Sequence, residues 1–301
     1  MSVQNEEECS IFSSKHDVYP LIDPKPHFEA QTFQDKVVII TGGSTGIGAV
    51  TATMYARAGA HVLIVARRVD RLEKTKSEIE KTVPNAEVLI VAGDISNSEV
   101  GKKVVKSAVE KWGRVDVVIA NSAVVMGGGA RFGEKDVEKW WYTQEVNVRG
   151  TLNIIHPAIP ELLKTKGQII VTTSDLAHSR FPLLADYSIS KHTINRFVEI
   201  LALDYPELTI YSVHPGVIPT DGALEFQERM GIKGTVIMPD TVELPAATFL
   251  WLTSRNAEIL NGRYVQATWE LNEVVAKKDE IVHDNLLVTK LAGPNLARSS
   301  V

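Results

Sequence analysis

Two side chains that could exchange a proton with a substrate lie four residues apart in the segment Tyr187-Ser188-Ile189-Ser190-Lys191. On a helix, this spacing places the Tyr187 phenol and the Lys191 ammonium group on one face. Taken alone, the spacing is common and is typical of two surface residues. A free phenol has a pKa of about 10, and a fixed cation nearby stabilises the phenolate and lowers that pKa. We therefore expect Lys191 to lower the pKa of Tyr187 and to make it an acid–base group.

A hydroxyl group stands thirteen residues before this phenol, at Ser174. It ends the segment from Gln168 to Thr173, which we expect to be a strand of a parallel sheet. The carboxyl ends of such strands form the edge at which open α/β folds bind ligands. Ser174 could therefore hold a substrate carbonyl oxygen beside the Tyr187 phenol.

Short apolar runs rich in β-branched residues recur along the chain, as expected for strands buried on both faces of a parallel sheet. We predict seven strands, which contain Val37–Ile40, Val62–Val65, Val88–Val91, Val115–Ile119, Gln168–Val171, Thr209–Val213 and, as a weaker signal, Arg263–Gln266. Helical segments alternate with them, and one begins at Asp70, a good capping residue, and runs to Ile79. The helical region around Ile155 contains Pro157 and Pro160, which should bend or interrupt it. The alternation predicts a Rossmann-type doubly wound α/β fold, with one mostly seven-stranded parallel sheet and helices on both faces.

A glycine-rich turn follows the first strand immediately and reads Thr41-Gly42-Gly43-Ser44-Thr45-Gly46-Ile47-Gly48. Helix formers continue from Ala49 to Ala58, so the turn has the strand–turn–helix context of a phosphate site. Glycines let the backbone approach a pyrophosphate, and the start of a helix offers free N–H groups and a partial positive charge. The spacing is not G-x-G-x-x-G, and no Gly-Lys-Ser/Thr follows, which excludes a P-loop. We expect this turn to bind a dinucleotide.

Two arginines follow the second strand, where proteins that bind NAD usually carry an acid that accepts hydrogen bonds from the ribose 2′-hydroxyl. The sequence there is Ala66-Arg67-Arg68, and Ala66 cannot accept a hydrogen bond from a hydroxyl group. The guanidinium of Arg67, with that of Arg68, could pair with a 2′-phosphate. The alternative is that both arginines are solvated residues ahead of a helix, above all Arg68. NADP(H) is therefore favoured over NAD(H).

Composition and charge exclude several classes of function. The 301 residues carry 32 Lys and Arg against 37 Asp and Glu, a net charge of −5 with no basic block, so we expect no nucleic acid or membrane partner. The single cysteine, Cys9, precludes an internal disulfide, and Glu6–Glu8 stand where a secretion signal would need a basic start. We therefore expect a cytoplasmic protein.

His178, His192 and His214 are spread too widely for a metal site, so we expect no metal.

Six motifs in their order along the chain resemble those of the short-chain dehydrogenase/reductase family, in its compact single-domain branch. They are the turn Thr41 to Gly48, Asp94-Ile95 after the third strand, Asn121-Ser122-Ala123 after the fourth, Asn147 in the next helix, Ser174 with Tyr187 and Lys191, and Pro215-Gly216 with Thr220. The resemblance covers about Lys36 to Gln266. Two residues depart from the family pattern. Ala123 replaces a common glycine and adds a methyl group near the cofactor, and Thr45 replaces the basic residue of many NADP-dependent members.

The resemblance implies a role for each of these residues. Tyr187 would be the general acid in reduction or the base in oxidation, Ser174 would orient and polarise the reacting oxygen, and Lys191 would also bind the nicotinamide ribose. Asn147 would hold a water that relays protons towards Lys191. The cofactor contacts would be Asp94 and Ile95 at the adenine, Asn121 with the adjoining Ser122 and Ala123 on the adenosine side, and Ile218 and Thr220, after Pro215-Gly216, at the carboxamide. Each residue also has a purely structural interpretation, such as a simple turn at Pro215-Gly216.

The shape of the substrate should be set by three variable loops, residues 124–132, 176–184 and 217–239. They carry the apolar residues that we expect to contact the substrate, namely Met126, Phe181, Leu183 and Leu224. We expect few charges to point inward. A bulky, mostly apolar ketone or alcohol is therefore favoured over a phosphorylated sugar or an acyl-carrier substrate.

The leading hypothesis is an NADPH-dependent carbonyl reductase or, in the reverse direction, an alcohol dehydrogenase. One alternative uses the same site for epimerisation, dehydration or another non-redox rearrangement. A second is a dinucleotide-binding protein without turnover, against which the intact Ser174, Tyr187 and Lys191 argue.

The resemblance also implies a homodimer or homotetramer that pairs through the helices holding Asn147 and Tyr187. We expect residues 1–34 to form an N-terminal arm, residues 35–269 the dinucleotide-binding domain with its substrate loops, and residues 270–301 a C-terminal extension. The arm should pack on its own or a neighbouring subunit through the apolar side chains of Tyr19, Leu21, Ile22 and Phe28.

Overall fold

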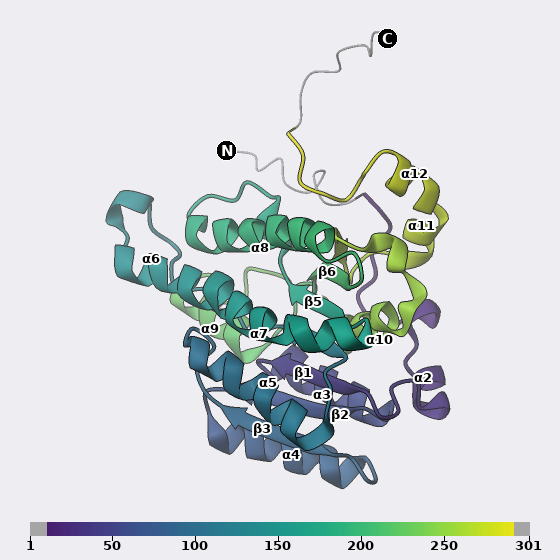
Figure 1. The fold of residues 1–301 in the computed structure, drawn as a ribbon. Coiled ribbons are helices and arrows are strands. Elements are labelled where there is room, and N and C mark those ends of the chain that lie inside the picture. Colours follow the sequence, from purple (N-terminus) through teal and green to yellow (C-terminus); the bar gives the residue numbers. More distant parts are fainter. Residues whose placement is uncertain (1–10, 292–301) are drawn as a thin grey trace.

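A parallel sheet of seven strands forms the centre of the computed structural model, which describes residues 11–291 (Figure 1). Cys9 and Glu6–Glu8 lie outside the described residues. The strands are β1 (Val37–Thr41), β2 (His61–Ala66), β3 (Val88–Ala92), β4 (Val117–Ala120), β5 (Gln168–Thr172), β6 (Thr209–His214) and β7 (Arg263–Gln266). They pair in the order β3-β2-β1-β4-β5-β6-β7, and every pairing is parallel. The predicted single parallel sheet is confirmed.

Alternate residues of each strand enter two separate hydrophobic cores. Val38 and Ile40 of β1 belong to one core, and Val37 and Ile39 belong to the other. All four side chains are fully buried. This burial on both faces is the physical reason why the strands appear in the sequence as uninterrupted apolar runs.

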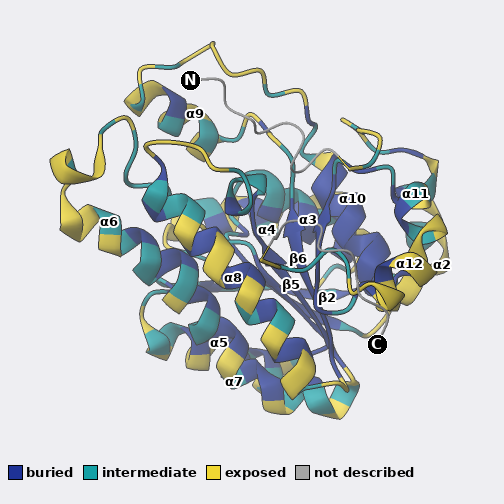
Figure 2. Cartoon of the chain, turned by 90° about the horizontal axis from the view of Figure 1, so that it is seen from above, coloured by how far each residue is buried: buried dark blue, intermediate teal, exposed yellow. Residues whose placement is uncertain are grey.

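Helices cover both faces of the sheet, as Figures 1 and 2 show. One core holds side chains of α3 (Gly46–Arg57), α4 (Val69–Thr82) and α10 (Glu243–Trp251), and the other holds those of α5 (Ser98–Trp112), α7 (Gly150–Thr165) and α8 (Ala185–Asp204). The remaining helices are α2 (Lys25–Ala30), α6 (Val137–Gln144), α9 (Asp221–Arg229), α11 (Leu271–Ala276) and α12 (Lys278–His283), with short helical turns η1 (Pro20–Ile22), η2 (Phe132–Glu134), η3 (Glu145–Arg149), η4 (Asp175–Ala177), η5 (Leu252–Asn256) and η6 (Glu258–Leu260). Within residues 11–291, no helix is both long enough and apolar enough to cross a membrane.

Three expectations about element bounds need correction. Strand β4 begins at Val117 rather than Val115, because the carboxylate of the intervening Asp116 turns to accept from the N–H of Val37 (2.9 Å). Strand β5 ends at Thr172 rather than Thr173. Ser174, which follows Thr173, is already the N-cap of η4. Helix α4 begins at Val69, so Asp70 lies in its first turn and does not cap it.

The two prolines of α7 do not interrupt it, because the helix continues from Gly150 to Thr165 through both. Pro157 lacks the N–H that would bond to the carbonyl of Asn153 one turn earlier. That carbonyl oxygen instead lies against α5, where a Cβ atom on Gly101 would approach it to 1.8 Å. Helix α5 thus packs closely on the side of α7 where the Asn153 carbonyl lacks its hydrogen bond within the helix.

The described part of the N-terminal arm, residues 11–34, packs on its own chain. Tyr19 and Ile22 are buried in the same core as α3 and α10, and Leu21 and Phe28 pack against that core. The Tyr19 hydroxyl donates to the carbonyl oxygen of Trp269 (3.1 Å) and accepts from the N–H of Leu271 (2.9 Å). The arm is therefore tied to the segment that follows β7.

Replacing Tyr19 by phenylalanine should lower the free energy of unfolding by about 1–3 kcal/mol, because it removes two hydrogen bonds made in the core. Tyr211→Phe is the matched control. Tyr211 is also buried, but its hydroxyl has no hydrogen-bond partner among the described residues, so its removal should leave stability unchanged or raised. Urea denaturation of both variants measures the difference, and equal losses would contradict the role assigned to the Tyr19 hydroxyl.

Candidate active site

The three predicted catalytic residues meet at the carboxyl end of β5. Ser174 follows this strand and caps η4, where its hydroxyl oxygen accepts from the N–H of Leu176 (3.2 Å). Tyr187 and Lys191 lie near the start of α8. Ser174 forms a hydrogen bond with the Tyr187 phenol, and Lys191 Nζ lies 5.7 Å from the centre of the phenol ring. The structure therefore brings the hydroxyl, the phenol and the ammonium group together.

Burial, and not the charge of Lys191, governs the pKa of the phenol. Burial and then the Asp175 carboxylate raise the pKa of Tyr187 to about 12, and the hydrogen bond with Ser174 offsets only part of this rise. Lys191 donates to the carbonyl oxygen of Thr172 (2.7 Å), and burial lowers the pKa of Lys191 to about 7. The expectation that Lys191 lowers the pKa of Tyr187 is therefore wrong for this arrangement. Loss of hydration dominates both groups, and it favours their neutral forms.

Asn147 lies in the π-helical turn η3 and is almost fully buried. Its Oδ1 accepts from the N–H of Val124 (2.8 Å), and its Nδ2 donates to the carbonyl oxygen of Val124 (2.9 Å) and to Ser190 Oγ (3.0 Å). Ser190 Oγ in turn donates to the carbonyl oxygen of Tyr187 (2.7 Å). The Asn147 side chain thus joins the loop after β4 to the helix that carries Tyr187.

The glycine turn closes tightly between β1 and α3. A Cβ atom on Gly48 would lie 2.3 Å from the carbonyl oxygen of Gly42, so no other residue fits at that position. Helix α3 begins at Gly46, and the side chain of Thr45 does not cap it. Ser44 and Ile47 lie on either side of this start. The side chain at the N-cap therefore leaves the first N–H groups of α3 unbonded, and a helix start of this kind can bind a pyrophosphate.

The ends of β1 and β4 are held together beside this turn. Thr41 Oγ1 accepts from the N–H groups of Asn121 and Ser122, both at 3.0 Å. Asn121 Nδ2 donates to the carbonyl oxygen of Thr41 (3.2 Å), and Thr172 Oγ1 donates to Asn121 Oδ1 (3.3 Å). Ala123, where the family commonly has glycine, is exposed. The motif after β4 thus lines the same edge of the sheet as the glycine turn and Ser174.

On the predicted adenosine side, Arg67 and Arg68 follow β2 and are both exposed. Burial opposes ionisation of Asp94, but hydrogen bonds from Ser96 and the positive charge of Arg67 together lower the pKa of Asp94. The Ile95 side chain is buried in the core, where it lies against Gly150 of α7. Arg67 and Asp94 are thus neighbours, whereas the Ile95 side chain serves packing.

The residues predicted to face the nicotinamide follow β6. Gly216 lies against Asp240, whose Oδ2 accepts from the N–H of Val217 (2.5 Å). His16 of the arm forms a hydrogen bond with the other oxygen of Asp240 through Nδ1 (2.6 Å). The segment continues from Pro215 through the buried Ile218 to Thr220, whose Cγ2 lies 3.1 Å from where a Cβ atom on Gly46 would stand. The turn after β6 therefore faces the phosphate turn and is fixed by the N-terminal arm.

The four predicted substrate residues lie in three segments, and the segment 217–239 is not wholly a loop as expected, because Leu224 lies in α9. Phe181, Leu183 and Leu224 are exposed, and Met126 is half-buried. The loop after β4 and the segment around α9 contact each other, since the Arg229 guanidinium donates to the carbonyl oxygen of Val125. Three of the four side chains are therefore accessible from solvent.

Sequence reasoning missed three ionisable residues at the site, Asp175, Lys135 and Asp186, and it considered His214 only as a metal ligand. Asp175 Oδ1 accepts from Ser174 Oγ (3.0 Å), and His214 Nδ1 lies 3.9 Å from the same oxygen. Lys135 and Asp186 form a buried ion pair. The available signal was position, because Asp175 follows Ser174 and Asp186 precedes Tyr187 in the sequence. In the part of the chain that the structure describes, no group of three His, Cys, Asp or Glu residues could hold a metal ion.

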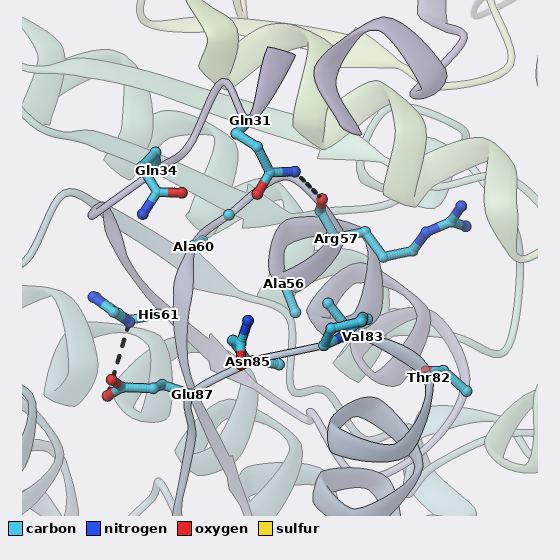
Figure 3. A pocket seen from close by; sticks show the side chains of 13 residues that line it. Gln31, Gln34, Ala56, Arg57, Ala60, His61, Thr82, Val83, Asn85 and Glu87 are labelled. Carbon is cyan, nitrogen blue, oxygen red and sulfur yellow. Dashed lines mark hydrogen bonds and ion pairs between the residues drawn. The ribbon is translucent and has the colours of Figure 1, made fainter. Parts of the chain in front are cut away.

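A surface pocket of about 480 Å³ opens at the opposite edge of the sheet (Figure 3). It is lined at the amino ends of β2 and β3 by His61 and Glu87, and also by Gln31, Arg57 and Asn85. None of the predicted catalytic residues lines it. Ligands of open α/β sheets bind beyond the carboxyl ends of the strands. We therefore place the candidate active site at the carboxyl ends, near Ser174, and not in this pocket.

Comparison with known proteins agrees with this geometry. The family described as short chain dehydrogenase matches residues 36–231. The short chain dehydrogenase pigC of Monascus ruber is 31% identical over 296 residues, which cover 94% of each chain. The short chain dehydrogenase andI of Emericella variicolor is 33% identical over 288 residues, or 93% of this chain and 95% of that protein. Among solved structures, an alcohol dehydrogenase from the archaeon Thermococcus sibiricus, complexed with 5-hydroxy-NADP, superposes with a TM-score of 0.66 at 27% identity, covering 78% of this chain and 97% of that chain.

Lys191→Met should flatten the dependence of stability on pH between pH 7 and pH 9. Burial lowers the pKa of Lys191 from its ordinary value of 10.5 to about 7, so between these values the unfolded state binds more protons than the folded state. The stability of the unaltered protein therefore rises as the pH is raised through this range, and it is lowest below pH 7, where the buried group is charged. Urea denaturation across this range measures the slope. Lys164→Met, at an exposed position, is the control, and a slope for Lys191→Met as steep as that of the control would refute the desolvation of Lys191.

Proposed function

The chain belongs to the short-chain dehydrogenase/reductase family, and we propose that within it the protein is an NADP(H)-dependent oxidoreductase that interconverts a ketone and a secondary alcohol. The substrate we propose is a bulky, mostly apolar small molecule. The observation that carries this proposal is the meeting of Ser174, Tyr187 and Lys191 at the carboxyl end of β5. The exposed apolar residues Phe181, Leu183 and Leu224, with the half-buried Met126, support the apolar character of the substrate.

Tyr187 is placed to act as the general acid in reduction. A pKa of about 12 keeps the phenol protonated at neutral pH, so it holds the proton that the substrate oxygen needs. Ser174 would hold the same oxygen by donating its hydroxyl hydrogen, which in this structure goes to Asp175 Oδ1 (3.0 Å). Oxidation requires Tyr187 to lose its proton first, and burial and Asp175 both oppose that loss. The protonated phenol therefore suits the proton-donating step of a reduction near pH 7.

The residues of the chain fit a dinucleotide. A Cβ atom on Gly42 would approach Asn121 and one on Gly48 would approach the backbone of Gly42, so glycines let the turn close tightly, and the first N–H groups of α3 would bind the pyrophosphate. Bound NADPH would supply the hydride to the carbonyl carbon. The exposed Arg67 would pair with the 2′-phosphate, and the archaeal alcohol dehydrogenase complexed with 5-hydroxy-NADP supports this preference. We assign the remaining contacts as the family resemblance implies, with Asp94 and Ile95 at the adenine, Asn121 on the adenosine side, Lys191 at the ribose, Ile218 and Thr220 at the carboxamide, and a relaying water held at Asn147.

We also propose a homodimer or homotetramer that pairs through α7 and α8. Ile189, Ile200 and Leu203 of α8 are 49%, 46% and 77% exposed, which supports burial of this helix against a second copy. Residues 35–269 would form the catalytic domain between the arm and the C-terminal extension, and the sequence favours a cytoplasmic location. Sedimentation of the purified protein measures the oligomeric state.

Tyr187→Phe should lower kcat by about 10²- to 10⁴-fold with bulky ketones, because it removes the transferable proton. The affinity for NADPH should stay within about twofold of the unaltered protein, since the ring remains in place. Oxidation of NADPH followed by absorbance, with the alcohol product quantified, measures both turnover and stoichiometry. Tyr205→Phe, at the other end of α8, is the control and should keep full activity. Near-normal turnover by Tyr187→Phe would refute the acid role, and turnover without consumption of NADPH would indicate a non-redox reaction.

Arg67→Ala should raise the KM for NADPH by about 10-fold or more while leaving the KM for NADH nearly unchanged. The reason is that a charge-assisted pair with the 2′-phosphate is lost, and NADH has no such group. Arg68→Ala is the neighbouring control, expected to have the smaller effect. Steady-state kinetics with both cofactors make the test, and equal changes in the two KM values would argue against a 2′-phosphate contact at Arg67.

A further inference from the structure

A buried ion pair joins the loop after β4 to the helix that carries Tyr187. Lys135 Nζ lies 3.4 Å from Asp186 Oδ1, and the two side chains are 5% and 0% exposed. Lys135 Nζ also donates to the carbonyl oxygen of Leu183 (2.8 Å). Placing two charges out of contact with water is costly unless further hydrogen bonds satisfy them. The ion pair is therefore stable only while the groups that hydrogen-bond to Lys135 and Asp186 stay in place, and the ion pair in turn holds those groups.

The other carboxylate oxygen of Asp186 holds the same loop at a second point and also holds α6. Asp186 Oδ2 accepts from the N–H of Gly127 (2.8 Å) and from Thr143 Oγ1 of α6 (3.0 Å). The carbonyl oxygen of Asp186 accepts from Gln144 Nε2 (2.7 Å), also of α6. A single residue at the start of α8 thus fixes the loop after β4 and the helix that follows that loop.

Two glycines of the loop after β4, Gly127 and Gly128, lie so close to neighbouring side chains that no larger residue fits there without a shift. A Cβ atom on Gly127 would lie 2.7 Å from Asp186 Oδ2, and one on Gly128 would lie 2.2 Å from Met230 Sδ. The backbone of the loop therefore passes between the Asp186 carboxylate on one side and the segment after α9 on the other. Any larger residue at Gly127 would push the loop away from Asp186, so its position is set by direct contact.

We propose that Lys135 and Asp186 are positioning residues that set how far the loop of residues 124–132 stands from the Tyr187 phenol, and thereby which substrates fit between them. This inference rests on the proposed function, with Tyr187 as the acid and the loop as a wall of the substrate site. Asp186 is bonded directly to Tyr187 in the chain, so a loop that is anchored on Asp186 is anchored relative to the phenol. Neither Lys135 nor Asp186 needs to touch the reacting atoms.

The test uses the full chain with Asp186→Asn, Lys135→Met and the double variant. Each single change leaves one buried charge without its partner, so the loop should shift and the KM for a bulky ketone should rise about 10- to 100-fold. The affinity for NADPH should stay within about twofold, since the phosphate turn and β6 are untouched. The double variant removes both charges and should recover part of the loss. Lys139→Met removes an exposed cation from the neighbouring α6 and is the matched control, expected to change neither value.

Hydrogen–deuterium exchange of the peptide amides gives a readout that does not need turnover. Exchange should increase at residues 121–136 in both single variants and stay unchanged in the strands. If Asp186→Asn does not fold, Lys135→Met provides the measurement, because its side chain keeps the apolar stem. Unchanged exchange at residues 121–136, or a ketone KM equal to that of Lys139→Met, would overturn the positioning role. Failure of the unaltered protein to turn over any ketone would refute the proposed function, while the exchange data would still decide whether the pair holds the loop.

Discussion

Burial of the parallel sheet on both faces is the constraint from which the rest of the molecule takes its form. Because alternate residues of each strand are committed to one core or the other, polar chemistry has room only beyond the strand ends. Thr41, Asn121 and Ser174 stand at or just past the ends of β1, β4 and β5, and the turn after β6 lies on the same edge. Parallel pairing brings these ends side by side, so residues far apart in the chain become neighbours without long connecting loops. The helices on both faces then protect that edge from movement.

Loss of hydration is the second effect that shapes the site. The same burial raises the pKa of Tyr187 to about 12 and lowers that of Lys191 to about 7, so an acid and a base are both moved towards their uncharged forms. The carboxylate of Asp175 adds to the first shift. The Tyr187 phenol and the Lys191 amine are therefore both available as neutral hydrogen-bond donors near neutral pH. The sequence alone suggested the opposite balance, because spacing reveals which groups are neighbours but not how much water they keep.

Patterns that act over a few residues were predictable from the sequence, and contacts between distant segments were not. The apolar runs located all seven strands, and the strand–turn–helix order located the glycine turn, since both depend on local periodicity. The prediction that Pro157 and Pro160 interrupt α7 was wrong, because the helix accommodates them through the packing of Gly101 against Asn153, which the sequence does not reveal. His16 and Asp240 are 224 residues apart, and Lys135 and Asp186 are 51 apart, so no local pattern connects either pair. Such pairs depend on topology, and each of them holds a segment beyond the carboxyl ends of the strands.

The docking of the N-terminal arm has a consequence for the order in which the molecule can be completed. His16 contacts Asp240, and Tyr19 contacts Trp269 across a separation of 250 residues. The segment that holds His16 and Tyr19 therefore cannot make these contacts until Asp240 and Trp269 have been synthesised. Closing such long loops late costs chain entropy, which only the finished core repays. The turn after β6 thus acquires the support of Asp240 only after residue 240 has been made, and a nascent chain that stops before this residue has the glycine turn but lacks the contacts of Asp240 with His16 and Val217.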